Sequence, residues 1–168
     1  MEIRRALSAD AADLARLSET TFTETFGHLY PPEDLATYIS GVCTEAHWRQ
    51  LMADPAVAAW IVGIAGAPPA GFILVGPCKL PVKNLESEAG EIRQLYVLAS
   101  HQNARLGAKL MDSALTWLAE QRRSPIYIGV WSENFRAQRF YARYGFSKVG
   151  EYGFPVGKTV DHEFILKR

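Results

Sequence analysis

A strand, a short helix and a second strand follow one another directly near the end of the sequence. This order limits the chain to folds in which helices pack as a layer against a sheet. β-Branched residues alternate with other residues over Ile126–Trp131, the period of a strand. Ser132 and Asn134 are both suited to cap a helix N-terminus. The helix expected over 134–144 then ends at Gly145, a residue type that commonly terminates helices.

The rest of the chain alternates in the same way. Further strands are expected at Glu2–Leu7, Val57–Ala65, Ala70–Val75, Glu91–Leu98, Phe146–Tyr152 and Val160–Leu166. Further helices are expected after a cap at Ser8 or Asp10, from Pro31 and Pro32 through Ile39, from Thr44 through Met52, and over Ala104–Arg122. The sequence GAPPAG predicts a hairpin between the second and third strands. This order favours a mixed α/β sheet in one layered domain.

Length and charge limit the number of domains and the classes of binding partner. The 168 residues are 48% hydrophobic, enough for one core and too few for two ordinary domains, so residues 1–168 are expected to form one domain. The 18 basic residues balance 18 acidic ones, which gives no bulk attraction to nucleic acid or to an anionic membrane. No apolar run reaches membrane-spanning length, and the first ten residues are too charged for a signal peptide. Cys43 and Cys78 lack metal-ligand spacing, so reduced thiols and a cytoplasmic protein are expected, with a disulfide between the two as the alternative.

The transition from strand to helix after residue 98 has the character of an anion site. A helix start presents unpaired N–H groups and the positive end of the helix dipole, which together accommodate a pyrophosphate. Gly107 permits close approach of a ligand to the backbone. An ordinary helix start with a glycine for packing explains the segment equally well.

Tyr141 has two interpretations. The residues Ala137, Phe140, Tyr141 and Tyr144 recur at helical spacing on one face, and that spacing alone favours a role in the core. A phenol, however, stays protonated at neutral pH, since its ordinary pKa is about 10. Its hydroxyl is therefore suited to donate a proton to a leaving group.

Two segments, EIRQLYVLASHQNARLGAKLM and WSENFRAQRFYARYGFSKVG, resemble the GNAT N-acetyltransferase superfamily in their order and spacing. The ending FYARYGF is the most specific part. The flanks LSETTFTETFGHLYPPEDLATYI and GFPVGKTVDHEFILKR are similar to the PaiA-type branch, which includes polyamine (spermidine/spermine) acetyltransferases. The resemblance covers nearly the whole chain. It implies a central, mixed, mostly antiparallel twisted sheet of about seven strands, flanked by helices and splayed between the fourth and fifth strands.

The resemblance also implies acetyl-CoA as co-substrate, no metal, and direct attack by an amine. It assigns cofactor contacts to the strand residues Leu95, Tyr96 and Val97, to the turn residues Gln102, Asn103, Ala104, Arg105, Leu106, Gly107 and Ala108, and to Asn134 and Ala137. The backbone N–H of Val97 would polarise the thioester carbonyl. Tyr141 would protonate the sulfur of coenzyme A.

Acceptor residues are expected on three segments. Glu91 lies where the family often has an acid that acts through water, although a surface charge or a salt bridge explains it equally well. Glu24, His28 and Tyr30 would form the acceptor wall, and their alternative is a solvated loop. The cluster Asp161, His162 and Glu163 suits a polycation or the solvent face of an edge strand.

The sequence departs from the family pattern at two positions. Arg105 replaces the first glycine of the usual Q/R-x-x-G-x-G/A turn, and Ala99 stands where proline is frequent. The arginine would either crowd the phosphates or pair with them.

The function expected from all of this is acetyl-CoA-dependent transfer of acetyl to a primary amine of a small molecule, with polyamines as candidates. Acetylation of a protein or peptide amine and a non-catalytic acyl-CoA-binding module are the alternatives. A closed, acidic acceptor pocket would disfavour a peptide, which needs an open groove. No nucleic-acid or membrane partner is expected, and a homodimer is the assembly common among relatives.

Overall fold

The computed structural model describes residues 1–168 and contains one seven-stranded sheet with the strand order β1-β2-β3-β4-β5-β7-β6. The strands are β1 (Glu2–Arg5), β2 (Ala58–Gly63), β3 (Gly71–Pro77), β4 (Gly90–Val97), β5 (Ile126–Trp131), β6 (Ser147–Val156) and β7 (Thr159–Lys167). The helices are α1 (Ala11–Phe26), α2 (Pro32–Val42), α3 (Glu45–Ala53), α4 (Leu106–Glu120) and α5 (Phe135–Ala142). Only β4 and β5 pair in parallel, so the predicted mixed, mostly antiparallel sheet is confirmed.

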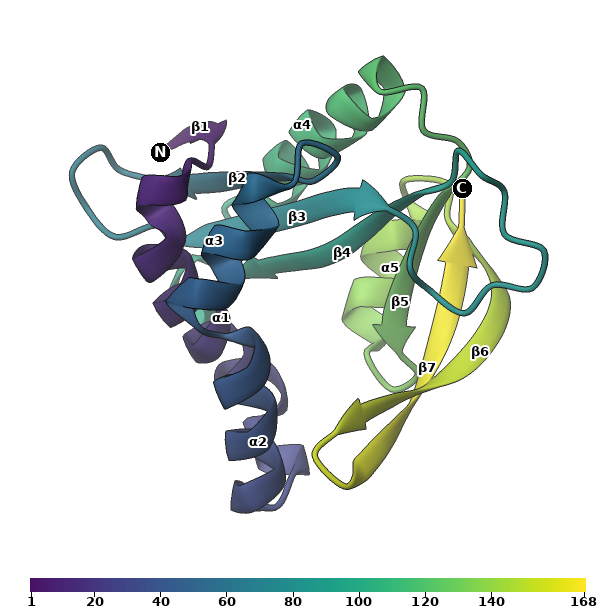
Figure 1. The fold of residues 1–168 in the computed structure, drawn as a ribbon, viewed down its shortest axis with the longest axis horizontal. Coiled ribbons are helices and arrows are strands. Elements are labelled where there is room, and N and C mark those ends of the chain that lie inside the picture. Colours follow the sequence, from purple (N-terminus) through teal and green to yellow (C-terminus); the bar gives the residue numbers. More distant parts are fainter.

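Helices cover both faces of the sheet (Figure 1). On one face α4 packs against strand residues such as Ile73 and Val75 in the larger core cluster. On the other face α1 and α3 pack against Phe72 and Leu74. The unbroken apolar run of β3 is explained by this arrangement, because a strand buried on both faces has no polar side. None of the five helices is both long and apolar enough to cross a bilayer.

β4 and β5 part soon after they meet. They pair only at Gly90 with Ile126 and at Glu91 with Tyr127, and beyond these pairs the strands diverge in Figure 1. A bulge in β4 accompanies the divergence, since Leu74 and Val75 of β3 face residues 94 and 92 and leave Arg93 as an extra residue. Bulges bend a strand and increase its twist, so the bulge turns β4 away from its parallel neighbour. The predicted splay is confirmed.

The β6–β7 hairpin is longer than the sequence indicates. β6 continues to Val156, four residues past the predicted end at Tyr152, although Gly153 and Pro155 are turn-forming residue types. Proline is tolerated here because β6 is an edge strand, in which one row of backbone groups needs no strand partner. The turn falls instead at Gly157, whose φ is +59°.

Two helix starts also differ from expectation. Neither Ser8 nor Asp10 caps α1 with its side chain. The Asp10 carboxylate instead turns back to accept hydrogen bonds from the Leu7 N–H at 2.8 Å and from Arg4 at 2.6 Å. α4 begins at Leu106 and not at Ala104, because the preceding residue is left-handed.

That left-handed residue is Arg105, at φ 57° and ψ 17°. Glycine adopts this region freely, whereas other residues pay a steric cost of roughly 1–2 kcal/mol. The position at which the family pattern has glycine therefore requires glycine-like geometry, and Arg105 adopts it under strain. Asn103, two residues earlier, is also left-handed at φ 69°.

The first turn of α2 is fixed to the tip of the β6–β7 hairpin. The buried Asp34 accepts hydrogen bonds from the backbone N–H of Lys158 at 2.9 Å and from both the N–H and the hydroxyl of Thr159, at 3.1 and 2.7 Å. Beside this contact Phe22, Tyr30 and Val156 form a small core cluster. The corner between α1 and α2 is thereby joined to a hairpin more than a hundred residues away in sequence.

We expect Asp34→Asn to lower the thermal midpoint at pH 7. The Lys158 N–H and the Thr159 hydroxyl lower the pKa of Asp34, so its stabilisation is present above the unfolded aspartate pKa of about 4 and is lost as the pH falls through the folded value. The difference from wild type should therefore shrink in acid. Thermal denaturation across pH measures it, with the exposed neighbour substitution Glu33→Gln as control. Equal midpoints of Asp34→Asn and wild type at pH 7 would contradict this account.

Arg105→Gly should raise the free energy of unfolding by up to about 1 kcal/mol, because glycine removes the left-handed strain and loses part of the gain to chain entropy. Arg105→Ala is the matched control, since it removes the guanidinium but keeps the Cβ. Urea denaturation of the ligand-free protein compares them. A glycine variant less stable than the alanine variant would show that the turn is unstrained.

Candidate active site

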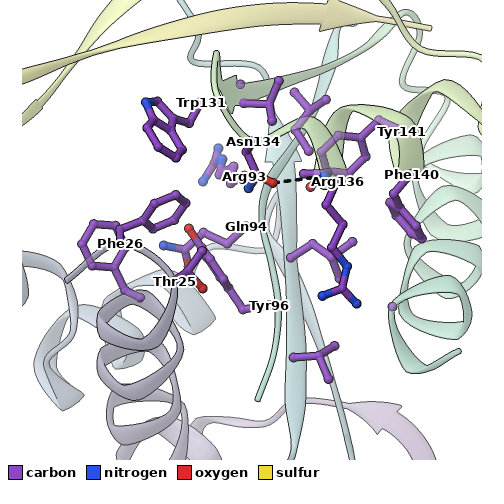
Figure 2. A pocket seen from close by; sticks show the side chains of 18 of the residues that line it. Thr25, Phe26, Arg93, Gln94, Tyr96, Trp131, Asn134, Arg136, Phe140 and Tyr141 are labelled. Carbon is purple, nitrogen blue, oxygen red and sulfur yellow. Dashed lines mark hydrogen bonds between the residues drawn. The ribbon is translucent and has the colours of Figure 1, made fainter. Parts of the chain in front are cut away.

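The parting of β4 from β5 opens a cleft of about 970 Å³. Its walls come from α1, β4, the turn before α4, β5, α5 and the β6–β7 hairpin. Figure 2 shows Trp131, Phe26 and Gln94 on one side of this cleft and Arg136, Phe140 and Tyr141 on the other. Segments far apart in sequence therefore supply two chemically different ends.

The structure brings most of the predicted site residues to this cleft. Those that line it are Glu24, Tyr30, Glu91, Leu95, Tyr96, Val97, Gln102, Asn103, Arg105, Leu106, Gly107, Ala108, Asn134, Ala137 and Tyr141. Ala104 and His28 are exposed and lie outside the lining. Ala104 sits between the two left-handed residues of the turn, and His28 lies in the short 3-10 turn after α1.

The free edge of β4 faces the cleft. The Leu98 N–H donates to Ala70 O at 2.9 Å, on the β3 side. Because the polar groups of successive strand residues point to alternate edges, the N–H and C=O of Val97 point to the β5 side. Consistent with this, Val97 O accepts a hydrogen bond from Gln102 Nε2 at 3.1 Å. An extended ligand could pair with this edge as an additional strand.

The N-terminus of α4 closes one end of the cleft. No side chain caps this helix, so the N–H groups of its first turn, including those of Gly107 and Ala108, have no intrahelical acceptor. These groups and the helix dipole make an anion site. The backbone of the turn therefore forms the anion site without any lysine.

Four arginines surround this end, and three of them are not among the site residues expected from the sequence. The set that lines the cleft is Arg105, Arg136, Arg139 and Arg143. Arg136 donates hydrogen bonds to Gln102 Oε1 at 2.5 Å and to Asn103 Oδ1 at 3.1 Å, which fixes the turn. Arg136, Arg139 and Arg143 are spaced so that they share one face of a helix, and this spacing can be seen in the sequence. The formal net charge of zero gives no sign of such a basic cluster.

Tyr141 is buried on α5 between Phe140 and Phe146, with ring centroids 5.4 and 6.1 Å away. Its hydroxyl makes no hydrogen bond within the protein, although the residue lines the cleft. Burial raises the pKa of Tyr141 above its usual value, and the Glu163 carboxylate raises it further. The phenol is therefore protonated at neutral pH and able to donate to a ligand.

Asn134 begins α5 and has a divided role. Its Oδ1 accepts a hydrogen bond from the Ala137 N–H at 3.1 Å and caps the helix, as the dashed line in Figure 2 marks. Of the two predicted caps, Ser132 and Asn134, it is Asn134 that caps the helix. The amide Nδ2 is left to donate into the cleft.

Aromatic and acidic side chains make up the other end. The aromatic residues there are Phe22, Phe26, Tyr30, Tyr38, Trp131 and Phe154. The Tyr30 hydroxyl donates a hydrogen bond to the Asp161 carboxylate and so connects the α1–α2 corner to β7. Glu24 is also held in place, because its Oε2 accepts a hydrogen bond from the Ala99 N–H at 3.0 Å. Aromatic faces and carboxylates together suit a cationic ligand.

Two polar atoms in the lining are buried without any partner in the protein. They are Arg93 Nε and Gln94 Oε1, both at the β4 bulge. Buried polar groups are rarely left without a hydrogen bond, so the bulge leaves two polar groups of the lining unsatisfied within the protein.

Two carboxylates of the cleft have raised pKa values. Glu91 is buried and forms no salt bridge, and its Oε2 accepts a hydrogen bond from the Lys79 N–H at 2.7 Å. Burial raises its pKa. Glu163 on β7 accepts a hydrogen bond from the Tyr152 hydroxyl, and burial raises its pKa to about 7. The sequence pattern alone does not distinguish Glu163 from its polar neighbours Asp161 and His162.

Comparison with known proteins places this geometry among enzymes. Residues 12–146 match the acetyltransferase (GNAT) family. An uncharacterized N-acetyltransferase in the pepI 3′ region of Lactobacillus delbrueckii subsp. lactis is 26% identical over 168 residues, covering 100% of this chain and 96% of that protein. An uncharacterized N-acetyltransferase of Archaeoglobus fulgidus is 30% identical over 142 residues, covering 84% of this chain and 90% of that protein.

The fold agrees with these matches. The crystal structure of the PaiA N-acetyltransferase from Thermoplasma acidophilum in complex with coenzyme A superposes with a TM-score of 0.78 at 16% identity, covering 99% of this chain and 97% of that one. The resemblance noted from the sequence motifs is thus confirmed at the level of family and fold. The chain belongs to the acetyltransferase (GNAT) family, and it is an acyltransferase.

Proposed function

We propose that this acyltransferase takes acetyl-CoA as co-substrate and transfers the acetyl group directly to a primary amine of a small molecule, with polyamines as the leading candidates. One observation carries the proposal. The free edge of β4 runs from an uncapped helix N-terminus to a buried, unpaired tyrosine hydroxyl. A nucleotide-tailed thioester has the matching parts in the same order: phosphates, an amide-bearing arm and a sulfur.

The cofactor contacts follow from that match. The pantetheine arm would pair with the backbone of Leu95, Tyr96 and Val97, and the pyrophosphate would lie on the turn Gln102–Ala108, with Ala104 contributing through its backbone. Asn134 Nδ2 would donate to the arm, and the small side chain of Ala137 would leave it room. Coenzyme A bound to the similarly folded Thermoplasma PaiA protein supports this assignment.

The chemistry assigns one role to each group of the chain. The Val97 N–H stabilises the charge that develops on the thioester oxygen when the amine attacks. Tyr141 donates its proton to the sulfur as the carbon–sulfur bond breaks. A carboxylate of the cleft accepts the proton of the incoming ammonium, and Glu91, acting through water, is the candidate that the family resemblance indicates.

The acceptor end favours a small molecule over a peptide. Asp34 and the hydrogen bond from Tyr30 to Asp161 join the α1–α2 corner to the β6–β7 hairpin across this end. A peptide chain would need an open groove there. The aromatic and acidic lining supports a cationic amine, and Glu24, Tyr30 and His28 lie on the segment that would bound it.

Release of free thiol from acetyl-CoA tests the proposal across polyamines, amino acids, aminoglycosides and N-terminal peptides. We expect spermidine or spermine to raise the rate well above the amine-free background, because their ammonium groups match the carboxylates. Turnover of peptides without turnover of small amines would overturn the acceptor assignment. Binding of acetyl-CoA with no turnover on any amine would identify a non-catalytic binding module instead.

The same assay includes a variant of the proposed acid. Tyr141→Phe should lower kcat by about 100-fold, since it removes a general acid, and should leave the Kd for coenzyme A within about twofold. Tyr144→Phe is the matched control, because Tyr144 does not line the cleft and its hydroxyl already bonds to Ala108 O and Asp112. If Tyr141→Phe keeps wild-type turnover, the sulfur receives its proton from another donor.

A further inference from the structure

We propose that Glu163, held in place by Tyr152, is the group that accepts the proton of the attacking amine. The inference rests on the proposed function and names a catalytic residue that neither the sequence analysis nor the family comparison assigns.

Glu163 occupies the middle of a row that crosses three strands. It lies directly opposite Trp131 of β5 and directly opposite Tyr152 of β6. Side chains opposite each other in antiparallel strands share a face, so all three point to the same side of the sheet. All three also line the cleft, and Glu163 is only half-buried there. A ligand in the acceptor end can therefore reach its carboxylate.

A glycine on the neighbouring strand leaves space for the pair. A Cβ at Gly129 would come within 2.3 Å of the Tyr152 hydroxyl oxygen and 3.0 Å of Glu163 Oε2. Gly129 lies on β5 two residues before Trp131, and its φ is not in the left-handed region. The requirement for glycine at this position is therefore steric, because the tyrosine and the carboxylate meet directly above it.

The surroundings of Glu163 favour a group that can bind and release a proton near neutrality. The ionisable groups around it are Tyr30, Tyr38, Tyr96, Tyr141, Tyr152 and Asp161. No lysine or arginine forms a salt bridge with it. Burial and the Asp161 carboxylate raise the pKa of Glu163 to about 7, while the hydrogen bond from Tyr152 opposes the rise. A base is most effective when its pKa lies near the working pH.

Glu91, the other cleft carboxylate with a raised pKa, has a structural role. Its Oε2 holds the Lys79 N–H at the start of the long connection between β3 and β4. It lies opposite Tyr127, at the closed end where β4 and β5 still pair. Glu163 lies opposite Trp131, four residues or roughly 13 Å further along β5, where the strands have separated. Only the second position lies beside the aromatic acceptor end.

The proton balance is simple. One N–H bond of the bound ammonium breaks, its proton passes to the Glu163 carboxylate, and the freed lone pair attacks the thioester carbon. The carbon–sulfur bond breaks, and the sulfur takes the proton of Tyr141. The attached nitrogen still carries one proton more than the amide, and it loses this proton to water as the carbon–sulfur bond breaks. After the amide and the thiol leave, Glu163 returns its proton to water and Tyr141 is protonated again from water.

The pH dependence of kcat tests this assignment on the full-length protein with the amine that gives the highest turnover. Wild-type kcat should rise with pH through about pH 7, as Glu163 loses its proton. Glu163→Gln should lower kcat by about 100-fold and abolish this inflection, with the Kd for coenzyme A within about twofold. A variant that raises KM but keeps both kcat and the inflection would show that Glu163 only binds the amine, and would overturn the proposal.

Three further variants separate a chemical role from a structural one. Tyr152→Phe removes the hydrogen bond that lowers the Glu163 pKa, so the inflection should move to higher pH. Glu151→Gln, the adjacent exposed carboxylate on β6 outside the cleft lining, should leave the profile unchanged. Glu91→Gln should keep the inflection, because the glutamine oxygen can still accept from the Lys79 N–H. Loss of the inflection in Glu91→Gln, with its retention in Glu163→Gln, would make Glu91 the base.

A measurement without turnover distinguishes this proposal from the proposed function. Carbon-13 NMR of the side-chain carboxyl groups, assigned through Glu163→Gln, should find Glu163 titrating near pH 7. Titration of Glu163 in the ordinary glutamate range, near pH 4, would overturn the proton-acceptor role even if the enzyme acetylates amines. Absence of thiol release with every amine, in contrast, would overturn the proposed function itself.

Discussion

The parting of β4 and β5 is the constraint on which the site depends. Two parallel strands in the middle of a sheet would normally satisfy each other's backbone groups along their length. Here the pairing stops after Gly90 and Glu91, and the bulge at Arg93 prevents its return. The exposed edge near Val97 is stabilised in part by Gln102, and a ligand of extended shape would complete it. The opened sheet thus loses strand pairing beside β4, and the same unpaired edge forms a binding surface.

The cleft separates charge along its length. Arginines and the N-terminus of α4 surround one end, and carboxylates with aromatic rings surround the other. A formal net charge of zero over the whole chain gives no sign of this separation, so bulk composition carries little functional information here. An anionic nucleotide tail and a cationic acceptor would thus be drawn to opposite ends, and the reacting groups would meet between them, beside Tyr141.

Local patterns in the sequence sufficed for most of the architecture. The apolar runs of β2 and β3, the alternation in β5 and the helical spacing around Tyr141 predicted the elements that the structure contains. They failed where long-range contacts override local preference. Pro155 reads as a turn residue, yet it continues β6 because β7 pairs beside it. The strain at Arg105 is invisible in a list of residue types, because it depends on how the turn enters α4.

The candidate site shows the same division. The family resemblance indicated residues on contiguous motifs, such as Val97, Gln102 and Asn134, and these residues line the cleft. Glu163 could not be predicted in this way, because its importance arises from the register of three strands, which brings it beside Tyr152 and over Gly129. A strand pattern predicts which residues share a face, but not what stands opposite them on the next strand.

Calorimetric titration of the folded, ligand-free protein with coenzyme A tests the central claim most directly. The claim is that the gap beside β4 is shaped for a nucleotide-tailed thiol. The account predicts saturable binding of one coenzyme A per chain, weakened when the 3′,5′-ADP or the pantetheine half is offered alone, since each half occupies only one part of the cleft. No heat of binding at millimolar coenzyme A, with the fold verified by circular dichroism, would contradict it.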